Sequence, residues 1–370
     1  MEVGNPKGTH LQRRVPDGRP GCGREATSRP ASISISIMVN LQQIPSPDLQ
    51  PKFRHGLRVI IVGVSYFLAT QLAFWLSRPE GVAAIWPAGA IGLVALLVNP
   101  RWLWPTLVTV LFASGVAANI LAGRPPMTCV GFMFTNIVET VLSAGVILYS
   151  CGDRILFRRI KEIGGLIFAA TVINAVTAGI GSGVATYTLG TSFWQSYQTW
   201  WVVNGAGLML FTPAIGLMRQ KISPGLVRPQ RVVETMLLLL TAGVGAGMLC
   251  GAAKLELPMA PSPYSFHAGL IWTALVFTWI ICRFGPSTMA VVLMMIAIIA
   301  IGFTVFGPGY PLSGYSRDEA LMIIQAYLGI AAIVGLFIAA GVEESRQTGE
   351  AFLQDKVRVQ IMGHDFTGEV

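Results

Sequence analysis

Hydrophobic residues along this chain gather into ten stretches of 17 to 25 residues, and polar loops separate them. A helix that crosses a bilayer needs roughly 20 consecutive apolar residues, because it rises about 1.5 Å per residue through a hydrocarbon core of about 30 Å. The pattern therefore predicts an all-α, polytopic membrane bundle of about ten transmembrane helices, with eight to ten as the range. The stretches are 57–76, 82–98, 102–121, 128–149, 163–187, 199–218, 232–253, 266–283, 286–305 and 320–341.

Loops on alternate sides of the predicted bundle differ in their basic residues. If the N-terminus is cytoplasmic, the inner loops contain ten Lys and Arg residues and the outer loops contain four. Because basic residues concentrate in cytoplasmic loops, we expect a multi-pass protein of the inner (plasma) membrane with both termini in the cytoplasm. If segment 82–98 were re-entrant, this assignment would break. The outer basic residues are Arg78, Arg124, Lys254 and Arg317.

Both ends of the chain differ from the apolar middle. Residues 1–50 are rich in Arg, Pro, Gly and Ser, which indicates a disordered tail, and an internal start at Met38 would remove most of it. Residues 343–370 read as a cytoplasmic helical linker or remnant without an output domain, with apolar residues at every fourth position. That spacing suits a helix that pairs with a second copy, so we expect a homodimer contact there. The positions are Leu353, Val357 and Ile361.

Composition supports a membrane protein and argues against several other classes. Apolar residues make up 53% of the chain and charged residues 12%, about half the charged share of a soluble domain. The formal charge of +8 lies largely in the tail and the loops, and no basic run with interleaved aromatic residues indicates nucleic-acid binding. The five cysteines lack metal-ligand spacing, and no GxSxG, HExxH or phosphate-binding loop occurs. We therefore expect no enzyme, no catalytic residues, no metal and no cofactor.

Glu139 is the acidic residue that lies well inside a predicted span, close to the bilayer midplane. A charge at that depth costs roughly 2.5–3.5 kcal/mol, so we expect this carboxyl group to be neutral, paired or in contact with water. Asn136 lies three residues earlier, on the same helical face. Two interpretations stay open here, which are a contact between packed helices and a site for a ligand or a proton.

Three further residues lie in the outer halves of their predicted helices, namely Trp86, Asn119 and Asn204. Together with Asn136 they would line one cavity that opens to the outside, with Glu139 at its floor. Unrelated packing and capping roles would produce the same set. We take these five residues as candidate ligand-binding residues. Separately, Gly179 and Gly183, four positions apart, predict a close approach of a neighbouring helix.

Four short motifs follow one another along the apolar stretches. They are Ala84-Ile85-Trp86-Pro87-Ala88-Gly89, Thr135-Asn136-Ile137-Val138-Glu139-Thr140, Trp200-Trp201 followed by Asn204 and by Thr212-Pro213, and Arg283-Phe284-Gly285. In these motifs and their order, residues 57–341 resemble the first type of membrane-associated sensor domain, known from bacterial signalling proteins. Two positions depart from that pattern. The family has Gly-Asp where this chain has Val203-Asn204, which puts a carboxylate role there in doubt, and its second Pro is Ala88.

The resemblance implies an integral sensory input module, which in the family usually has nearer eight helices and precedes a cytoplasmic histidine kinase or diguanylate cyclase. The partners it implies are the lipid bilayer, an unknown small ligand and an output kinase or cyclase that acts in trans. The chain is alternatively the N-terminal part of a truncated sensor kinase or cyclase. A hypothesis from another class is a secondary transporter that uses Glu139 as a proton or ion site.

Overall fold

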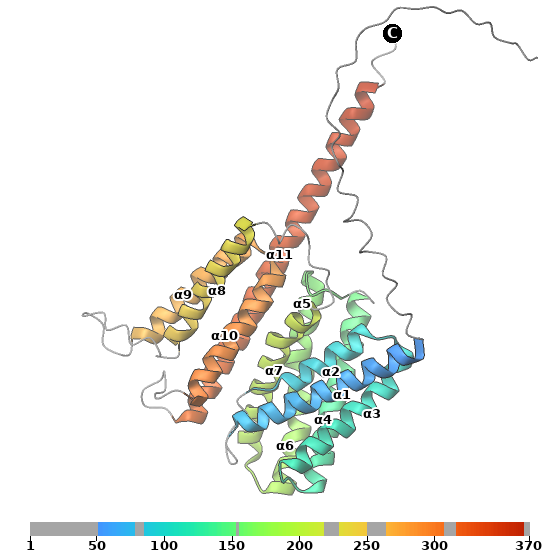
Figure 1. Cartoon of the computed structure of the whole chain (residues 1–370), viewed down its shortest axis with the longest axis vertical. Coiled ribbons are helices and arrows are strands. Elements are labelled where there is room, and N and C mark those ends of the chain that lie inside the picture. Colours follow the sequence, from blue (N-terminus) through green and yellow to red (C-terminus); the bar gives the residue numbers. More distant parts are fainter. Residues whose placement is uncertain are drawn as a thin grey trace, which may run out of the picture. The chain divides into compact units, whose positions relative to one another are not determined.

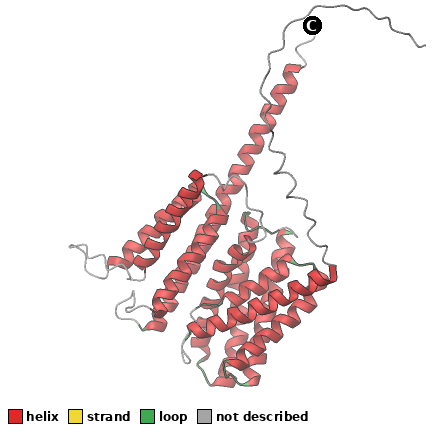
Figure 2. Cartoon of the chain, in the orientation of Figure 1, coloured by secondary structure: helices red, strands yellow, loops and turns green. Residues whose placement is uncertain are grey.

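The structure is a computed structural model that describes residues 51–77, 85–152, 155–217, 229–249, 264–306 and 316–365. Within these residues every regular element is a helix and no strand occurs, as Figures 1 and 2 show. The predicted all-α fold is therefore confirmed. The expected disordered tail and the alternative start at Met38 lie outside the described residues.

The helices follow one another in chain order, α1 to α11 (Figure 1). The first part comprises α1 (Pro51–Leu76), α2 (Pro87–Val98), a 3₁₀ turn (Arg101–Leu103), α3 (Trp104–Leu121) and α4 (Pro126–Cys151). Next come α5 (Ile160–Phe168), a π-helical turn (Ala169–Ile173), α6 (Asn174–Leu189) and α7 (Phe193–Leu217). The last part comprises α8 (Pro229–Leu249), α9 (Tyr264–Arg283), α10 (Pro286–Phe306) and α11 (Arg317–Asp365).

Each of the ten predicted apolar stretches overlaps a described helix, and residues 82–84, 218 and 250–253 of these stretches lie outside the described residues. In the described part of the chain, seven helices are long and apolar enough, by length and composition, to cross a membrane. One of the seven is the continuous span Ile160–Leu189, which joins α5, the π-helical turn and α6. Three shorter apolar helices accompany them, within α2, α8 and α9. The polytopic bundle is confirmed, while the exact number of crossings stays a prediction.

Segment α2 is short and lies alongside α1. Its 12 residues span about 18 Å, less than a bilayer core. At its start, the Trp86 ring lies 5.9 Å from the Phe74 ring near the end of α1. Just beyond its end, the Trp102 ring lies 4.9 Å from the His55 ring near the start of α1. Helix α2 is therefore antiparallel to α1, while the predicted crossing of the membrane by segment 82–98 stays a prediction.

Proline and glycine mark many of the helix ends. Pro is the first residue of α2, α4 and α10, where its missing N–H has no helical partner to lose. Four glycines beyond helix C-termini adopt a positive φ, which a residue without a Cβ adopts at little cost. They are Gly123, Gly152, Gly190 and Gly285, with φ of 77°, 79°, 70° and 88°.

Helix α7 is central to the packing, since it contacts α2, α5, α6, α10 and α11. In its most apolar window 61% of the residues are buried, against 28% in α1. Close approach to α7 depends on glycine: a Cβ on Gly207 would lie 2.5 Å from the backbone oxygen of Trp86, and one on Gly205 would lie 2.8 Å from that of Ala170. The close approach predicted at Gly179 and Gly183 is wrong, because a Cβ there would meet nothing within 4 Å.

Helix α11 continues far beyond the last predicted stretch without a break. It runs from Arg317 to Asp365, and Figure 1 shows its C-terminal part extending past the other helices. Residues 344–354 are exposed. Leu353, one of the three positions expected to pair with a second copy, is 62% exposed. The side chains of Val357 and Ile361 lie outside the described residues.

Candidate functional site

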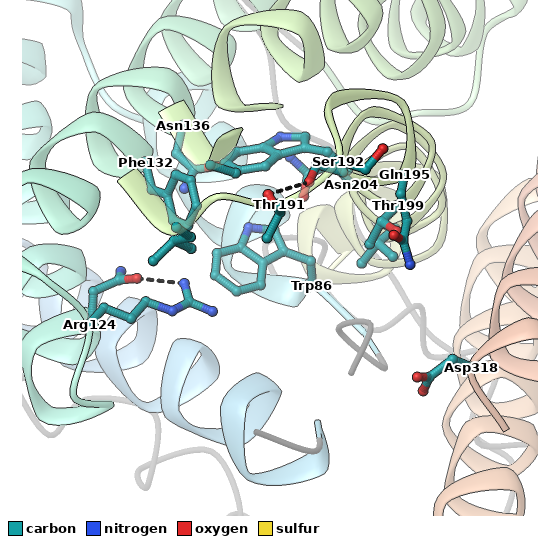
Figure 3. Close-up of a pocket in the computed structure, with 16 residues that line it drawn as sticks. Trp86, Arg124, Phe132, Asn136, Thr191, Ser192, Gln195, Thr199, Asn204 and Asp318 are labelled. Carbon is teal, nitrogen blue, oxygen red and sulfur yellow. Dashed lines mark hydrogen bonds between the residues drawn. The ribbon is translucent and has the colours of Figure 1, made fainter. Parts of the chain in front are cut away.

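A cavity of about 420 Å³ lies at the end of the bundle where α3 and α6 end and α4, α7 and α11 begin. We refer to this end as the cavity end (Figure 3). Its volume falls in the range of small-molecule sites, which is about 300–1,000 Å³. Four of the five candidate residues line it, namely Trp86, Asn119, Asn136 and Asn204. Segments far apart in the sequence thus contribute to one hollow.

Glu139, the fifth candidate, lies behind the cavity lining. Its side chain is 5% exposed, and its Oε2 accepts a hydrogen bond of 2.9 Å from Nδ2 of Asn204. Its Oε1 has no hydrogen-bond partner among the described residues. Of the three expected environments, neutral, paired or in contact with water, the structure shows this carboxyl group hydrogen-bonded to a neutral amide. Asn204 stands where the resembled pattern has Asp, and its amide supplies the donor that a second carboxyl group would supply only when protonated.

Arg124 extends into the cavity from the turn between α3 and α4. Its Nη1 donates a 2.8 Å hydrogen bond to Oδ1 of Asn119, and its guanidinium carbon lies 4.5 Å from the ring centre of Phe74 and 5.4 Å from that of Phe132. Burial lowers the pKa of Arg124 from its ordinary value, yet arginine stays protonated in proteins. The cavity thus contains a positioned positive charge.

Two tryptophans supply flat apolar walls. The ring of Trp200 packs edge-on against Phe132 at 5.1 Å, and a Cβ on Gly181 would lie 2.7 Å from this indole. The Nε1 atoms of Trp86 and Trp200 have no hydrogen-bond partner among the described residues. Buried polar atoms normally find partners, so each unsatisfied donor beside a cavity favours a ligand or water there.

Hydroxyl and amide groups from the start of α7 complete the neutral part of the lining. Thr191 and Ser196 share a 3.0 Å hydrogen bond, and Figure 3 shows Thr191, Ser192, Gln195 and Thr199 together on one side of the hollow. Short polar side chains of this kind orient a polar ligand without adding a net charge.

Sequence reasoning missed both charged residues of the lining, Arg124 and Asp318. Arg124 was assigned only to an outer loop, although an isolated Arg on the side with few basic residues, five positions after Asn119, was a usable signal. Asp318 lies in the first turn of α11. No local signal connects it with residues almost two hundred positions earlier, because only the packing of α11 on α7 brings it to the cavity.

The opposite end of the bundle is closed by a set of polar contacts. Oε2 of the buried Glu162 accepts hydrogen bonds from the backbone N–H groups of Leu156, Arg158 and Arg159, at 3.2, 2.9 and 3.5 Å. Oε2 of Glu344 accepts one from the N–H of Ile160 at 3.3 Å. Arg346 donates to the backbone oxygen of Cys282. We refer to Ile160, Glu162, Cys282, Glu344 and Arg346 as the polar collar.

The sequence profile of the MASE1 family matches residues 56–346. The chain belongs to the MASE1 family. MASE1 domains are membrane-associated sensory input domains, so the resemblance stated from the motifs is confirmed. Comparisons with curated proteins and with solved structures give no significant match.

Residues of the four MASE1 motifs lie mainly in two places in the fold, while Thr212 and Pro213 are buried within α7 and do not line the cavity. Trp86, Asn136, Glu139 and Asn204 belong to the cavity or its floor. Arg283-Phe284-Gly285 forms the turn between α9 and α10, beside the polar collar. In that turn Gly285 adopts a φ of 88° and donates a 3.1 Å hydrogen bond to the backbone oxygen of Ile280. A Cβ on Gly285 would lie 3.5 Å from Oε2 of Glu343 in α11.

Proposed function

We propose that this MASE1 domain binds a small ligand in the cavity and passes a helix rearrangement to a cytoplasmic output along α11. The observation that carries the proposal is that one uninterrupted helix reaches both places. Asp318, in its first turn, lines the cavity, and Glu344 and Arg346 of the same helix belong to the polar collar. Residue 344 lies 26 positions after residue 318, which corresponds to about 39 Å at the helical rise.

A continuous helix suits this role because it transmits a shift or rotation at one end to the other end with little loss. A ligand biases such an equilibrium only through contacts that differ between two states. Asp318 supplies a contact of this kind, because it is the one α11 residue in the described lining of a cavity that is otherwise formed by α2 to α7 and their connections. In this proposal α11 is the helix that moves. Small displacements of packed helices at interfaces are a common form of such switching.

The orientation in the membrane forms part of the proposal. Near the polar collar lie Arg101, Arg158, Arg159, Lys161 and Arg283, whereas Arg124 and Arg317 lie at the cavity end. The positive-inside tendency then favours a cytoplasmic collar in the inner membrane and a cavity that faces outward. The N-terminus and the end of α11 are both cytoplasmic in this arrangement.

The exposed part of α11 is the proposed point of contact with other chains. Residues 344–354 are exposed, and Leu353 presents an apolar side chain on that segment. We propose that this segment pairs with a second copy of the chain and engages a histidine kinase or diguanylate cyclase output. MASE1 domains act as input modules, which supports an output partner of this class.

The test is an output measurement with the full chain fused after Val370 to a diguanylate cyclase domain. Thr199→Phe fills the cavity, since Thr199 lines it. We expect the variant to change the cyclase output of membranes by about fivefold or more, the lower range of allosteric coupling. Gln198→Phe is the matched control, because Gln198 is exposed and does not line the cavity. An unchanged output with Thr199→Phe contradicts the proposal.

A transport assay separates the sensor from the transporter hypothesis. The full chain is reconstituted in vesicles with a proton-sensitive dye inside, and amino acids, sugars and organic acids are supplied outside. We expect no solute-driven proton entry, because a sensor does not expose its site alternately to both sides of the membrane. Proton-coupled uptake that Glu139→Gln abolishes would replace the sensor by the transporter.

A further inference from the structure

Two of the residues that line the cavity carry a charge, and the charges are opposite. They are Arg124 and Asp318. Neither forms an ion pair with a residue in the part of the chain that the structure describes. Figure 3 shows them on opposite sides of the hollow, with Trp86 between them. The cavity is therefore dipolar, positive toward the turn between α3 and α4 and negative toward α11.

The positive side is prepared for a carboxylate. One nitrogen of Arg124, Nη1, is held by Oδ1 of Asn119, and the rings of Phe74 and Phe132 flank the guanidinium group. The other guanidinium nitrogens donate no hydrogen bond to the described residues. A planar guanidinium group with donors to spare matches the two oxygens of a carboxylate.

The negative side is prepared for an ammonium group. Asp318 lies in the first turn of α11, at the end of the helix that faces the cavity. Its neighbour Glu319 accepts hydrogen bonds from the backbone N–H and the hydroxyl of Ser316, both at 2.8 Å. Asp318 has no such bond to the described residues and instead lines the cavity. The two adjacent acidic residues therefore differ: Glu319 bonds to Ser316 at the start of α11, and Asp318 lines the cavity.

The middle of the cavity suits an uncharged spacer. Trp86, Trp200 and Val203 present apolar surface, and Asn136, Thr199 and Asn204 present neutral polar groups. A ligand with a single charge would leave Arg124 or Asp318 in a confined site without an opposite charge. Both side chains are half-buried, so a ligand with one charge of each sign gains from both, whereas a singly charged ligand gains from only one.

We infer that the ligand is a small zwitterion, whose carboxylate binds Arg124 and whose ammonium group binds Asp318 across a short uncharged spacer. The inference rests on the proposed function of the cavity as the ligand site. Such a molecule connects the turn between α3 and α4 directly to α11. An anion without an ammonium group binds Arg124 alone, so it forms no ion pair with Asp318 of α11.

The test is a binding measurement with the full chain in lipid nanodiscs. The probes are the unbranched amino acids from glycine to 6-aminohexanoate, with the amino and carboxyl groups at opposite ends. The unbranched carboxylates and the primary alkylamines of the same lengths serve as single-charge probes. We expect one or two lengths of the amino acid to bind, by calorimetry and by a raised thermal midpoint, at least about tenfold more tightly than either single-charge probe.

Variants at the two charged residues distinguish the ends of the ligand. Asp318→Asn should weaken binding of the best amino acid at least about tenfold and leave the weak binding of the matching carboxylate unchanged. Arg124→Gln should weaken binding of both. The matched controls are Glu319→Gln, one position along α11, and Arg101→Gln, at the opposite end of the bundle. Neither residue lines the cavity, so both controls should bind as the parent does.

Exchanging the two charges distinguishes a loss of ligand binding from a loss of folding. The double variant Arg124→Asp with Asp318→Arg restores one charge of each sign, and the amino acid then binds in the reversed direction. We expect the double variant to bind more tightly than either Arg124→Asp or Asp318→Arg alone. Double-variant binding no tighter than that of the singles would contradict the inference, provided that the thermal midpoint without ligand equals that of the parent.

Two outcomes separate this inference from the proposed function. If carboxylates bind as tightly as the amino acids, the inferred zwitterionic ligand is wrong, but the proposed ligand-sensing role of the cavity is not contradicted. The same conclusion follows if no probe binds while Thr199→Phe still changes the cyclase output. If no probe binds and Thr199→Phe leaves the output unchanged, both are wrong.

Discussion

The two ends of the bundle use their polar groups in opposite ways. At the polar collar, one buried carboxylate, Glu162, accepts three backbone hydrogen bonds, and Glu344 and Arg346 attach α11 to neighbouring elements. At the cavity end, polar atoms of Trp86, Trp200 and Glu139 lack partners among the described residues. Polar groups whose hydrogen bonds are all formed favour a single structure. Polar groups beside a cavity that lack a partner remain able to hydrogen-bond to a ligand.

Stability and response to a ligand are located at different ends of the bundle. Contacts at the collar hold the connection between α4 and α5 against α11, so changes there should mainly alter unfolding. Groups at the cavity end add little to the fold, so changes there should mainly alter binding and output. Natural proteins often concentrate unsatisfied or strained groups at functional sites, which agrees with this division.

The largest expected effect is at the collar. Glu162→Ala removes the acceptor of three backbone N–H groups from a side chain that is 2% exposed. Loss of these bonds should lower the free energy of unfolding by about 3 kcal/mol, measured by chemical unfolding in mixed micelles. Glu344→Ala is the matched control at an exposed collar carboxylate, with an expected loss of less than about 1 kcal/mol. Equal losses in the two variants would show that the collar is not organised around Glu162.

The next effect concerns the buried pair behind the cavity. Glu139→Lys places a charge close to the middle of the membrane, at a cost of about 2.5–3.5 kcal/mol, and opposes the Asn204 amide donor. We expect this variant to accumulate poorly in membranes, as quantified by immunoblot. Glu139→Gln keeps an acceptor for Asn204 and should accumulate and melt as the parent does. If the Lys variant also behaves as the parent, the carboxyl group of Glu139 faces water and its burial has no structural role.

A smaller effect is expected where α7 meets the start of α2. A Cβ on Gly207 would lie 2.5 Å from the backbone oxygen of Trp86, so Gly207→Ala must displace that backbone. We expect a loss of about 1–3 kcal/mol in the free energy of unfolding. Gly183→Ala, where a Cβ meets nothing within 4 Å, should be neutral or slightly stabilising because alanine favours the helix. A neutral Gly207→Ala would mean that α2 shifts freely against α7.

The smallest effect on stability is expected in the neutral lining of the cavity. Thr199→Val keeps the shape of a half-buried side chain and removes its hydroxyl group. The free energy of unfolding should change by no more than about 0.5 kcal/mol. A loss as large as that of Glu162→Ala would erase the distinction between the two ends.

Sequence patterns predicted the helices well because bilayer thickness imposes a long apolar stretch on every crossing. The relation between Asn136 and Glu139 was also predictable, since three positions along a helix share a face. Their meeting with Asn204, some 65 positions away, was expected only from similar depth in the membrane. Position along a predicted span indicates how deep a residue lies in the membrane. It does not indicate which neighbouring helix the side chain faces.

The remaining parts depend on tertiary packing. Asp318 reaches the cavity because α11 packs on α7, and nothing near it in the sequence reports that contact. Glycine spacing misled in the same way: Gly179 and Gly183 suggested a helix contact, yet the residue between them, Gly181, is the one under the Trp200 ring. A spacing of four identifies residues on one helix face, whereas Gly181, two positions from each of them, lies about 200° around the helix on nearly the opposite face.

If the cavity is coupled to the polar collar through α11, amide hydrogen exchange of the full chain in nanodiscs should detect the coupling. Thr199→Phe fills the cavity, and Gln198→Phe is its control. The account predicts that Thr199→Phe alone changes exchange at the amide of Ile160, which bonds to Glu344, and along residues 344–354 of α11. Changes confined to residues around the cavity, with the collar amides exchanging as in the parent, would contradict it.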